Sequence, residues 1–239
     1  MTRRLMTFAA LAALCGFAPQ ASSAPITYVD ASTANTALAA GGAFTPTTTP
    51  AGGVNGDDNW SVRAFGNGGG VFTSNDAGAG VNAENAPGLA TTITGLSPGL
   101  PYNVFGYFWD GSGNWRLKAS LTQAPPLADD PSVSFSADGS ASSTNASPAV
   151  AADFAVSPLL SEGDRVLQQA VLGIATADAN GNILVYIDDL ADPTVSSTQR
   201  TWYDGVGYSL VPEPSASLLA MGCMAGASLL FRRRKVGAA

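Results

Sequence analysis

Short runs in which apolar and polar residues alternate recur through the middle of the chain, between closely spaced glycines and prolines. Such alternation indicates β-strands, and Gly and Pro mark the turns between them. Helical periodicity is poor, apart from a short turn near residues 30–38. We therefore predict an all-β fold, a single antiparallel β-sandwich or jelly-roll-like domain. The predicted strands lie at residues 59–65, 70–74, 91–94, 102–109, 115–121, 132–136, 171–176, 183–188 and 201–210.

Two of the predicted turns connect strands that are close in sequence. Residues 110–114 follow the strand at 102–109, and residues 178–182, which contain an Asn-Gly pair, follow the strand at 171–176. Asn-Gly favours the positive φ values of a tight turn. The pattern therefore predicts a β-hairpin at each of the two turns.

The predicted strand from Tyr102 to Trp109 is apolar on both faces. Tyr102 and Val104 share one face, whereas Phe105 and Trp109 share the other. Such a strand is expected to be central in its sheet and covered on both sides. The passage into it, residues 91–109, resembles the E-to-F strand passage of fibronectin type III-like sandwiches.

The two ends of the chain carry targeting signals. Arg3 and Arg4 precede the apolar residues 5–17, and residues 21–24 are small, which is the pattern of a signal peptide at residues 1–23. Near the other end, residues 215–231 contain no charge and would span about 25 Å as a helix. The hydrocarbon core of a bilayer is about 30 Å thick, slightly more than this helix length. Local thinning of the bilayer and snorkelling of the flanking arginine can make up the difference, so we predict a C-terminal transmembrane helix there.

The C-terminal signal has three consecutive parts. Pro212-Glu213-Pro214 precedes the apolar run, and Arg232-Arg233-Arg234-Lys235 follows it. Basic residues stay on the cytoplasmic side, which places the domain at residues 24–210 outside the inner membrane. An ordinary single-pass anchor remains the alternative.

This tail, residues 211–235, resembles the PEP-CTERM sorting signal of Gram-negative-type bacteria. The resemblance implies that Pro212, Glu213 and Pro214 form the recognition triplet and that Arg232, Arg233 and Arg234 form the basic stop. It also implies an exosortase-type processing enzyme as partner. The protein would be held transiently in the inner membrane and then reach the cell surface or the extracellular matrix.

The composition of the exported region excludes several functions. Acidic residues outnumber its basic residues more than threefold, so nucleic acid is excluded as a partner. The chain has no histidine, which removes Ser-His-Asp and Cys-His catalysis and most zinc sites. Cys15 and Cys223 lie in the two signals, so the exported region forms no internal disulfide. The basic residues of the exported region are Arg63, Arg116, Lys118, Arg165 and Arg200.

Aromatic residues beside polar ones suggest a carbohydrate site. Exposed aromatic rings stack on sugar faces, while neighbouring carboxylates and amides bind hydroxyls. The alternative is that the same rings fill the core. The candidate carbohydrate contacts are Trp109, Asp110, Asn114, Trp115 and Trp202.

One acidic segment has the spacing of a calcium loop. Asp178, Asn180 and Asn182 place hard oxygen ligands at alternate positions, and Asp189 occupies position twelve, where a glutamate would complete an EF-hand. The alternative is a hairpin turn that binds no metal. Calcium is the one cofactor that the sequence suggests.

These observations predict a non-enzymatic, exported protein with a structural or adhesive role and contact with extracellular polysaccharide. Two alternatives remain open. One is a polysaccharide-processing enzyme that uses paired aspartates. The other is a permanently anchored single-pass envelope protein.

Overall fold

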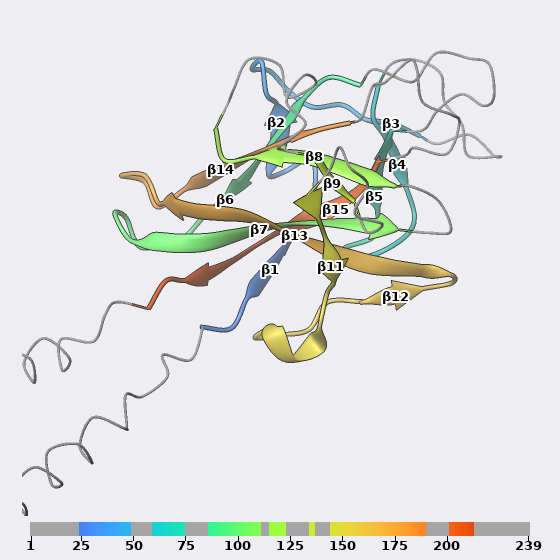
Figure 1. Ribbon diagram of the computed structural model, residues 1–239. Coiled ribbons are helices and arrows are strands. Elements are labelled where there is room, and N and C mark those ends of the chain that lie inside the picture. The colour runs from blue at the N-terminus through green and yellow to red at the C-terminus, as the bar shows by residue number, and fades with distance from the viewer. Residues whose placement is uncertain are drawn as a thin grey trace, which may run out of the picture. The chain divides into compact units, whose positions relative to one another are not determined.

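The computed structural model describes residues 24–48, 59–74, 86–110, 115–122, 134–136, 144–189 and 201–212. In this part of the chain the regular structure is β-strand, apart from one short 3₁₀ helix. Figure 1 shows the strands as two layers within the compact unit Pro25–Val211. The prediction of an all-β sandwich is confirmed.

Three long strands form the centre of the larger sheet, which has nine strands among the described residues. β13 (Arg165–Thr176), β7 (Pro101–Asp110) and β15 (Thr201–Leu210) lie side by side in that order. β7 pairs antiparallel with both neighbours and has no free edge. The shorter strands are β11 (Ser147–Pro148) and β12 (Ser161–Glu162) on β13, β1 (Thr27–Asp30) and β5 (Val71–Ser74) on β15, and β4 (Ser61–Arg63) and β3 (Thr47–Thr48) beyond β5.

The smaller sheet contains six described strands and is centred on β14 (Ile183–Asp188). β14 pairs antiparallel with β8 (Arg116–Ser120) on one edge and with β6 (Leu89–Ile93) on the other. The remaining strands are β2 (Thr36–Leu38) beyond β6, and β9 (Ser134–Ser136) and β10 (Thr144–Asn145) beyond β8.

Alternation along the strands builds one core between the two sheets. Val104 and Phe108 of β7 face Leu117, Val185 and other buried residues of the smaller sheet, within one continuous apolar cluster. Burial of this apolar surface is the main source of stability in a domain without a disulfide.

A second apolar cluster lies on the outer face of the nine-stranded sheet. Tyr107 and Trp109 of β7 belong to it, and Phe154, next to the 3₁₀ helix η4 (Ala151–Asp153), covers it. The backbone of Ile26 fixes this cover: its N–H donates to the carbonyl of Asp153, and its carbonyl accepts from Ala155. The prediction that β7 is covered on both sides is confirmed.

Both predicted hairpins are wrong. β7 and β13 belong to the nine-stranded sheet, whereas β8 and β14, the strands that follow them, belong to the six-stranded sheet. Both edges of β7 are already taken by β13 and β15, so β8 cannot pair with it. The chain therefore passes from one sheet to the other between β7 and β8 and between β13 and β14. Alternation identifies a strand but does not identify its partner.

The chain also changes sheets between β6 and β7. The passage from strand E to strand F of immunoglobulin-like sandwiches does the same. The Tyr102 hydroxyl accepts a hydrogen bond from the backbone N–H of Ser97 at 3.0 Å. A tyrosine whose hydroxyl contacts the backbone a few residues upstream is the tyrosine corner of these folds. This corner fixes the direction in which β7 enters the larger sheet.

Two further expectations concern segments outside this framework. Residues 30–38 contain the end of β1, a turn at 33–35 and β2. The Thr36 backbone N–H donates to the Ser32 carbonyl at 2.9 Å, so the short turn expected there is present as a single turn. No helix among the described residues is long and apolar enough to cross a membrane. The predicted membrane segment at 215–231, the signal peptide and the tail beyond Pro212 lie outside the described residues.

Candidate functional site

All three predicted carbohydrate-contact tryptophans meet at one place on the outer face of the nine-stranded sheet. Trp115 and Trp202 lie 4.6 Å apart between ring centroids. Phe65 packs edge-on against Trp109 at 5.0 Å and against Trp202 at 5.2 Å. We call Phe65, Trp109, Trp115 and Trp202 the indole cluster. β7, β15 and the residues that border β4 and β8 bring its members together.

The indole cluster is buried. Trp109 is 0% exposed, Trp202 1% and Trp115 6%. Their ring faces therefore pack against protein groups, and a sugar could stack on them only after displacing those groups. Asp110 is partly buried at the end of β7, and Asn114 lies outside the described residues.

Two arginines cover the indole cluster. The Arg165 guanidinium lies 4.5 Å from the ring centroid of Trp202, 5.0 Å from that of Trp115 and 5.2 Å from that of Phe65. The Arg63 guanidinium lies 4.6 Å from the same Trp202 centroid. Each such cation–π contact contributes about 0.5–2 kcal/mol, depending on how far it is shielded from water. The aromatic rings are thus buried beneath two guanidinium groups, which are themselves partly exposed to solvent.

A carboxylate cluster lies on the same face of the sheet. Asp204 occupies a β-bulge, where the pairing of β15 with β7 shifts between Tyr203 and Gly205. A bulge turns a side chain away from the regular alternation. Asp204 is 0% exposed, and its Oδ2 accepts hydrogen bonds from the Tyr28 hydroxyl at 2.6 Å and from Asn67 Nδ2 at 2.8 Å. Its Oδ1 accepts from the Asn67 backbone N–H at 3.2 Å.

These bonds hold the glycine-rich loop of residues 66–70 against the sheet. A Cβ at Gly66 would lie 2.5 Å from Asp204 Oδ1 and 2.6 Å from the indole nitrogen of Trp109, so only glycine fits there. The loop is also held from its other side, because Glu162 Oε2 accepts from the Gly66 N–H at 2.8 Å. Asp204 therefore connects β15, β1 and this loop in one hydrogen-bonded unit.

Asp30 is the second carboxylate of the cluster and is about half buried. The Tyr28 hydroxyl lies 3.5 Å from Asp30 Oδ1 as well as 2.6 Å from Asp204 Oδ2. Burial, followed by the nearby Asp204 charge, raises the pKa of Asp30 to about 6. Burial also raises the pKa of Asp204, although the hydrogen bonds from Tyr28 and Asn67 oppose the rise.

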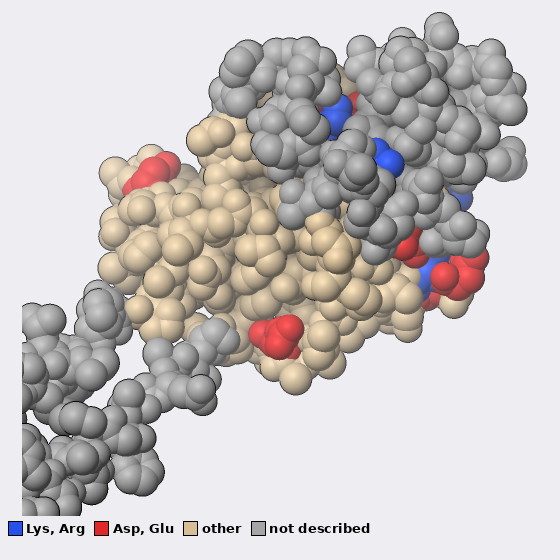
Figure 2. Space-filling view, in the orientation of Figure 1, with Lys and Arg blue, Asp and Glu red and all other residues tan. Residues whose placement is uncertain are grey.

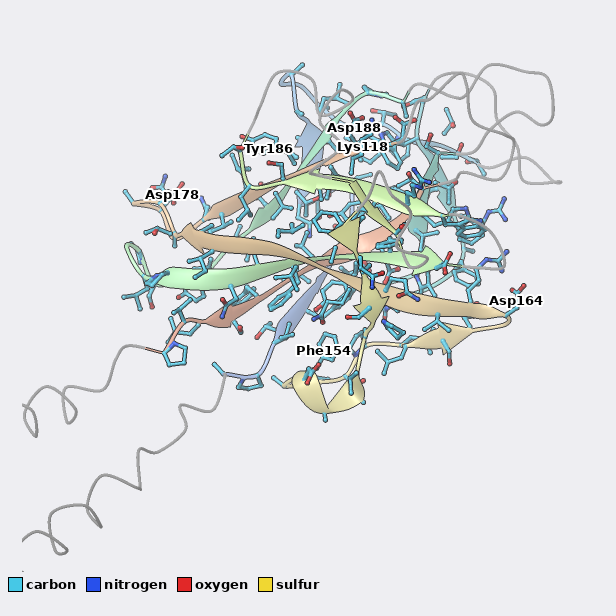
Figure 3. All side chains as sticks on the ribbon, in the orientation of Figure 1. Lys118, Phe154, Asp164, Asp178, Tyr186 and Asp188 are labelled. Carbon is cyan, nitrogen blue, oxygen red and sulfur yellow. The ribbon has the colours of Figure 1, made fainter. Side chains whose placement is uncertain are left out.

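The predicted calcium ligands do not come together. Asp178 Oδ1 accepts the backbone N–H groups of Asn180 and Asn182, each at 2.8 Å, which is the bonding of an ordinary polar turn. Asp189 lies beyond the opposite end of β14, and a six-residue strand is about 17–20 Å long. Figure 3 shows Asp178 well separated from Asp188, the neighbour of Asp189. One ion cannot contact both ends of this set, and the described residues hold no metal-binding group of three His, Cys, Asp or Glu.

Asp189 has a structural role instead. Its Oδ2 accepts from the Ser74 hydroxyl at 2.6 Å and from the Ala86 N–H at 3.0 Å. It thereby joins the end of β5 to the residues that precede β6. Burial raises the pKa of Asp189 to about 7 and that of neighbouring Asp188 to about 6, with the Lys118 charge opposing both shifts.

We expect the domain to lose stability as the pH rises from about 4 to about 7. Asp30, Asp188, Asp189 and Asp204 all have a pKa in the folded state above the ordinary value of 3.8. The folded state then binds protons more tightly than the unfolded chain, so the stabilisation is complete below the unfolded pKa and is lost as the pH passes the folded values. The melting temperature should be several degrees higher at pH 5 than at pH 8, since each kcal/mol corresponds to about 2–4 °C.

A matched variant tests the origin of this pH dependence. Asp189→Asn removes one of the titrating groups and should flatten the curve of melting temperature against pH. Asp164→Asn serves as the control, because Asp164 is 71% exposed. A melting temperature that is highest at pH 8 would contradict the prediction.

The sequence pattern identified the tryptophans but not the groups that organise them. Asp204 stands inside a predicted strand, between Tyr203 and Gly205, and an acidic residue at such a position is the signal that could have identified it. Arg63 and Arg165 likewise lie on strands with apolar neighbours. Nothing local indicates that both would reach the same indole ring.

Comparisons with known proteins give little further information. No protein-family model matches the chain, and no curated protein matches it. A structural match to a xanthan lyase of Paenibacillus covers 72% of this chain and 14% of the lyase, with 15% identity and a TM-score of 0.34. At that TM-score the similarity supports no conclusion about function.

Proposed function

We propose that this chain is an exported surface or matrix protein with a structural or adhesive role, sorted by its C-terminal tail and in contact with extracellular polysaccharide. The three-part tail supports the sorting. The burial of Asp204 supports the non-enzymatic role, because both of its oxygens accept hydrogen bonds that hold the fold. The polar groups gathered on this face thus stabilise a rigid sandwich.

The sorting tail is tested with Glu213→Ala in the native host. The wild-type protein should be recovered at the cell surface or in the matrix without Arg232–Lys235, and the variant should accumulate in the inner membrane with its tail intact. Mass spectrometry of the C-terminal peptide in each fraction gives the measurement. Asp164→Ala, which removes one exposed carboxylate from the domain, is the control and should be processed normally. Normal processing of Glu213→Ala would contradict the assignment of the tail as a sorting signal. A wild-type protein that keeps its tail in the envelope would show that the tail is a permanent anchor.

A polysaccharide-processing enzyme is the second candidate function. The observation that favours it is the pair Asp30 and Asp204, whose carboxylates share the Tyr28 hydroxyl and have a raised pKa. Paired carboxylates with separated roles perform glycoside hydrolysis. Asp30→Asn should abolish any hydrolysis of extracted matrix polymer if this candidate is correct. Absence of hydrolysis by the wild-type protein would remove it.

A further inference from the structure

Among the described residues, the partly exposed basic side chains are two arginines, and both lie against the indole ring of Trp202. Four basic residues lie in the described part of the chain. Arg116 and Lys118 are buried, at 8% and 3% exposure, whereas Arg63 and Arg165 are partly exposed. Figure 2 shows most of the visible described surface without charge, and the blue atoms stand in separate spots in the right half of the view, some of them beside red atoms. An otherwise acidic domain therefore presents a local cationic surface.

The two guanidinium groups are held close to one another. Arg63 Cζ and Arg165 Cζ lie 4.6 and 4.5 Å from the Trp202 centroid, so they are at most 9.1 Å apart, the sum of the two distances. Like charges this close repel one another, and an anion near both offsets that repulsion. The buried rings beneath them fix their positions, so a ligand would not have to order two long side chains.

Arg165 retains donors for an incoming anion. A guanidinium carries five N–H groups, and the one salt bridge of Arg165 among the described residues is the 3.1 Å contact of Nη1 with Asp164 Oδ1. Asp164 is 71% exposed, and such a surface pair is weak and readily exchanged. Glu162 lies opposite Arg165 in the backbone pairing of β12 with β13, and its Oε2 accepts a hydrogen bond from the Gly66 N–H. The planar fork of Arg165 thus matches a carboxylate from outside the chain.

We propose that Arg63 and Arg165, stacked on Trp202, bind the carboxylate groups of an acidic polysaccharide. This inference rests on the proposed function and names its ligand class as a glycan that carries uronic-acid-type carboxylates. The two guanidinium groups bind the charge, and Asp164 competes with the ligand for Arg165. The net negative charge of the domain opposes binding of denser polyanions such as nucleic acid.

The test compares two forms of one glycan. Polygalacturonate and its fully methyl-esterified form share a backbone and differ in charge. Binding of the full-length chain, purified in detergent, is followed by tryptophan fluorescence and by calorimetry. We expect polygalacturonate to bind at least ten times more tightly than the ester, and its affinity to fall as the salt concentration rises.

Matched variants locate the site. Arg165→Gln should weaken polygalacturonate binding at least tenfold, whereas Arg165→Lys, which keeps the charge but loses the fork, should have an intermediate affinity. Thr176→Glu makes the same change in charge at an exposed position at the far end of β13 and should retain near wild-type affinity. Asp164→Asn should strengthen binding two- to fivefold, and Asp178→Asn, an equal change in charge at a distant turn, should not. The Asp164→Asn comparison remains informative if Arg165→Gln fails to fold.

Several outcomes would overturn the inference: equal affinity for the two forms of the glycan, equal effects of Arg165→Gln and Thr176→Glu, or duplex DNA binding as tightly as polygalacturonate. None of them contradicts the proposed function, because processing of the tail and location in the matrix are measured separately. A chain that is not sorted to the surface would contradict the proposed function and leave the binding result standing.

Discussion

Asp204→Ala is expected to lower the free energy of unfolding by about 3 kcal/mol. The substitution removes the carboxylate that accepts from the Tyr28 hydroxyl and from two N–H donors of Asn67. That carboxylate has no exposure to water, and its donors are partly buried. Buried donors left without an acceptor each cost about 1–3 kcal/mol. Urea unfolding followed by tryptophan fluorescence measures the loss, because Trp109 and Trp202 lie beside the cluster and are buried.

Asp204→Asn is the matched control for this prediction. Asparagine keeps the size of the side chain and one acceptor oxygen, and it removes a charge that burial disfavours. It should cost less than half as much as the alanine variant at pH 7. A loss below about 1 kcal/mol for Asp204→Ala would show that the loop of residues 66–70 does not depend on this carboxylate.

The sequence predicted the positions of nine of the fifteen described strands, but not their pairing. The six strands that it missed are short: β1, β2, β3, β10, β11 and β12. Apolar residues on both faces of β7 indicated that both faces are covered, and the structure agrees. Alternation along the chain suggested hairpins after β7 and β13, yet the following strands join the other sheet. A turn that connects two layers and a turn that closes a hairpin are both short and rich in Gly and Asn. The difference lies in distant strands, since β15 occupies the edge of β7 that a hairpin partner would need.

At the candidate site, too, the sequence indicated which residues are involved but not how distant parts of the chain bring them together. The tryptophans were visible in the sequence because aromatic residues are rare and lie beside predicted turns. Their burial depends on Phe65 and Arg165, which come from elements far away in the sequence. The role of Asp204 depends on a bulge in β15 and on a loop that precedes it by more than a hundred residues. Long-range contacts of this kind leave no local pattern.

Gly205 follows Asp204 in β15 and pairs with Asp30 of β1, and Gly205→Ala is expected to lower the free energy of unfolding by about 2–3 kcal/mol because the added methyl group has no room against β1. A Cβ at Gly205 would overlap the carbonyl oxygen of Val29 and would lie 2.7 Å from the Tyr28 hydroxyl. The carbonyl belongs to the backbone of β1 and cannot move away without breaking the pairing of Asp30 with Gly205. The substitution therefore disturbs β1 and releases Tyr28 from Asp204 at the same time.

Gly88→Ala separates this steric effect from the general effect of adding a methyl group. A Cβ at Gly88 would meet its nearest neighbour, the Ala39 methyl, at an ordinary contact distance of 3.6 Å. This variant should be as stable as the wild type or more stable by up to about 1 kcal/mol, because alanine restricts the unfolded chain. Equal unfolding midpoints for Gly205→Ala and Gly88→Ala would show that β1 can move away from β15 at little cost. In that case Tyr28 could not be what holds Asp204 in place, and the loss expected for Asp204→Ala would have to come from Asn67 alone.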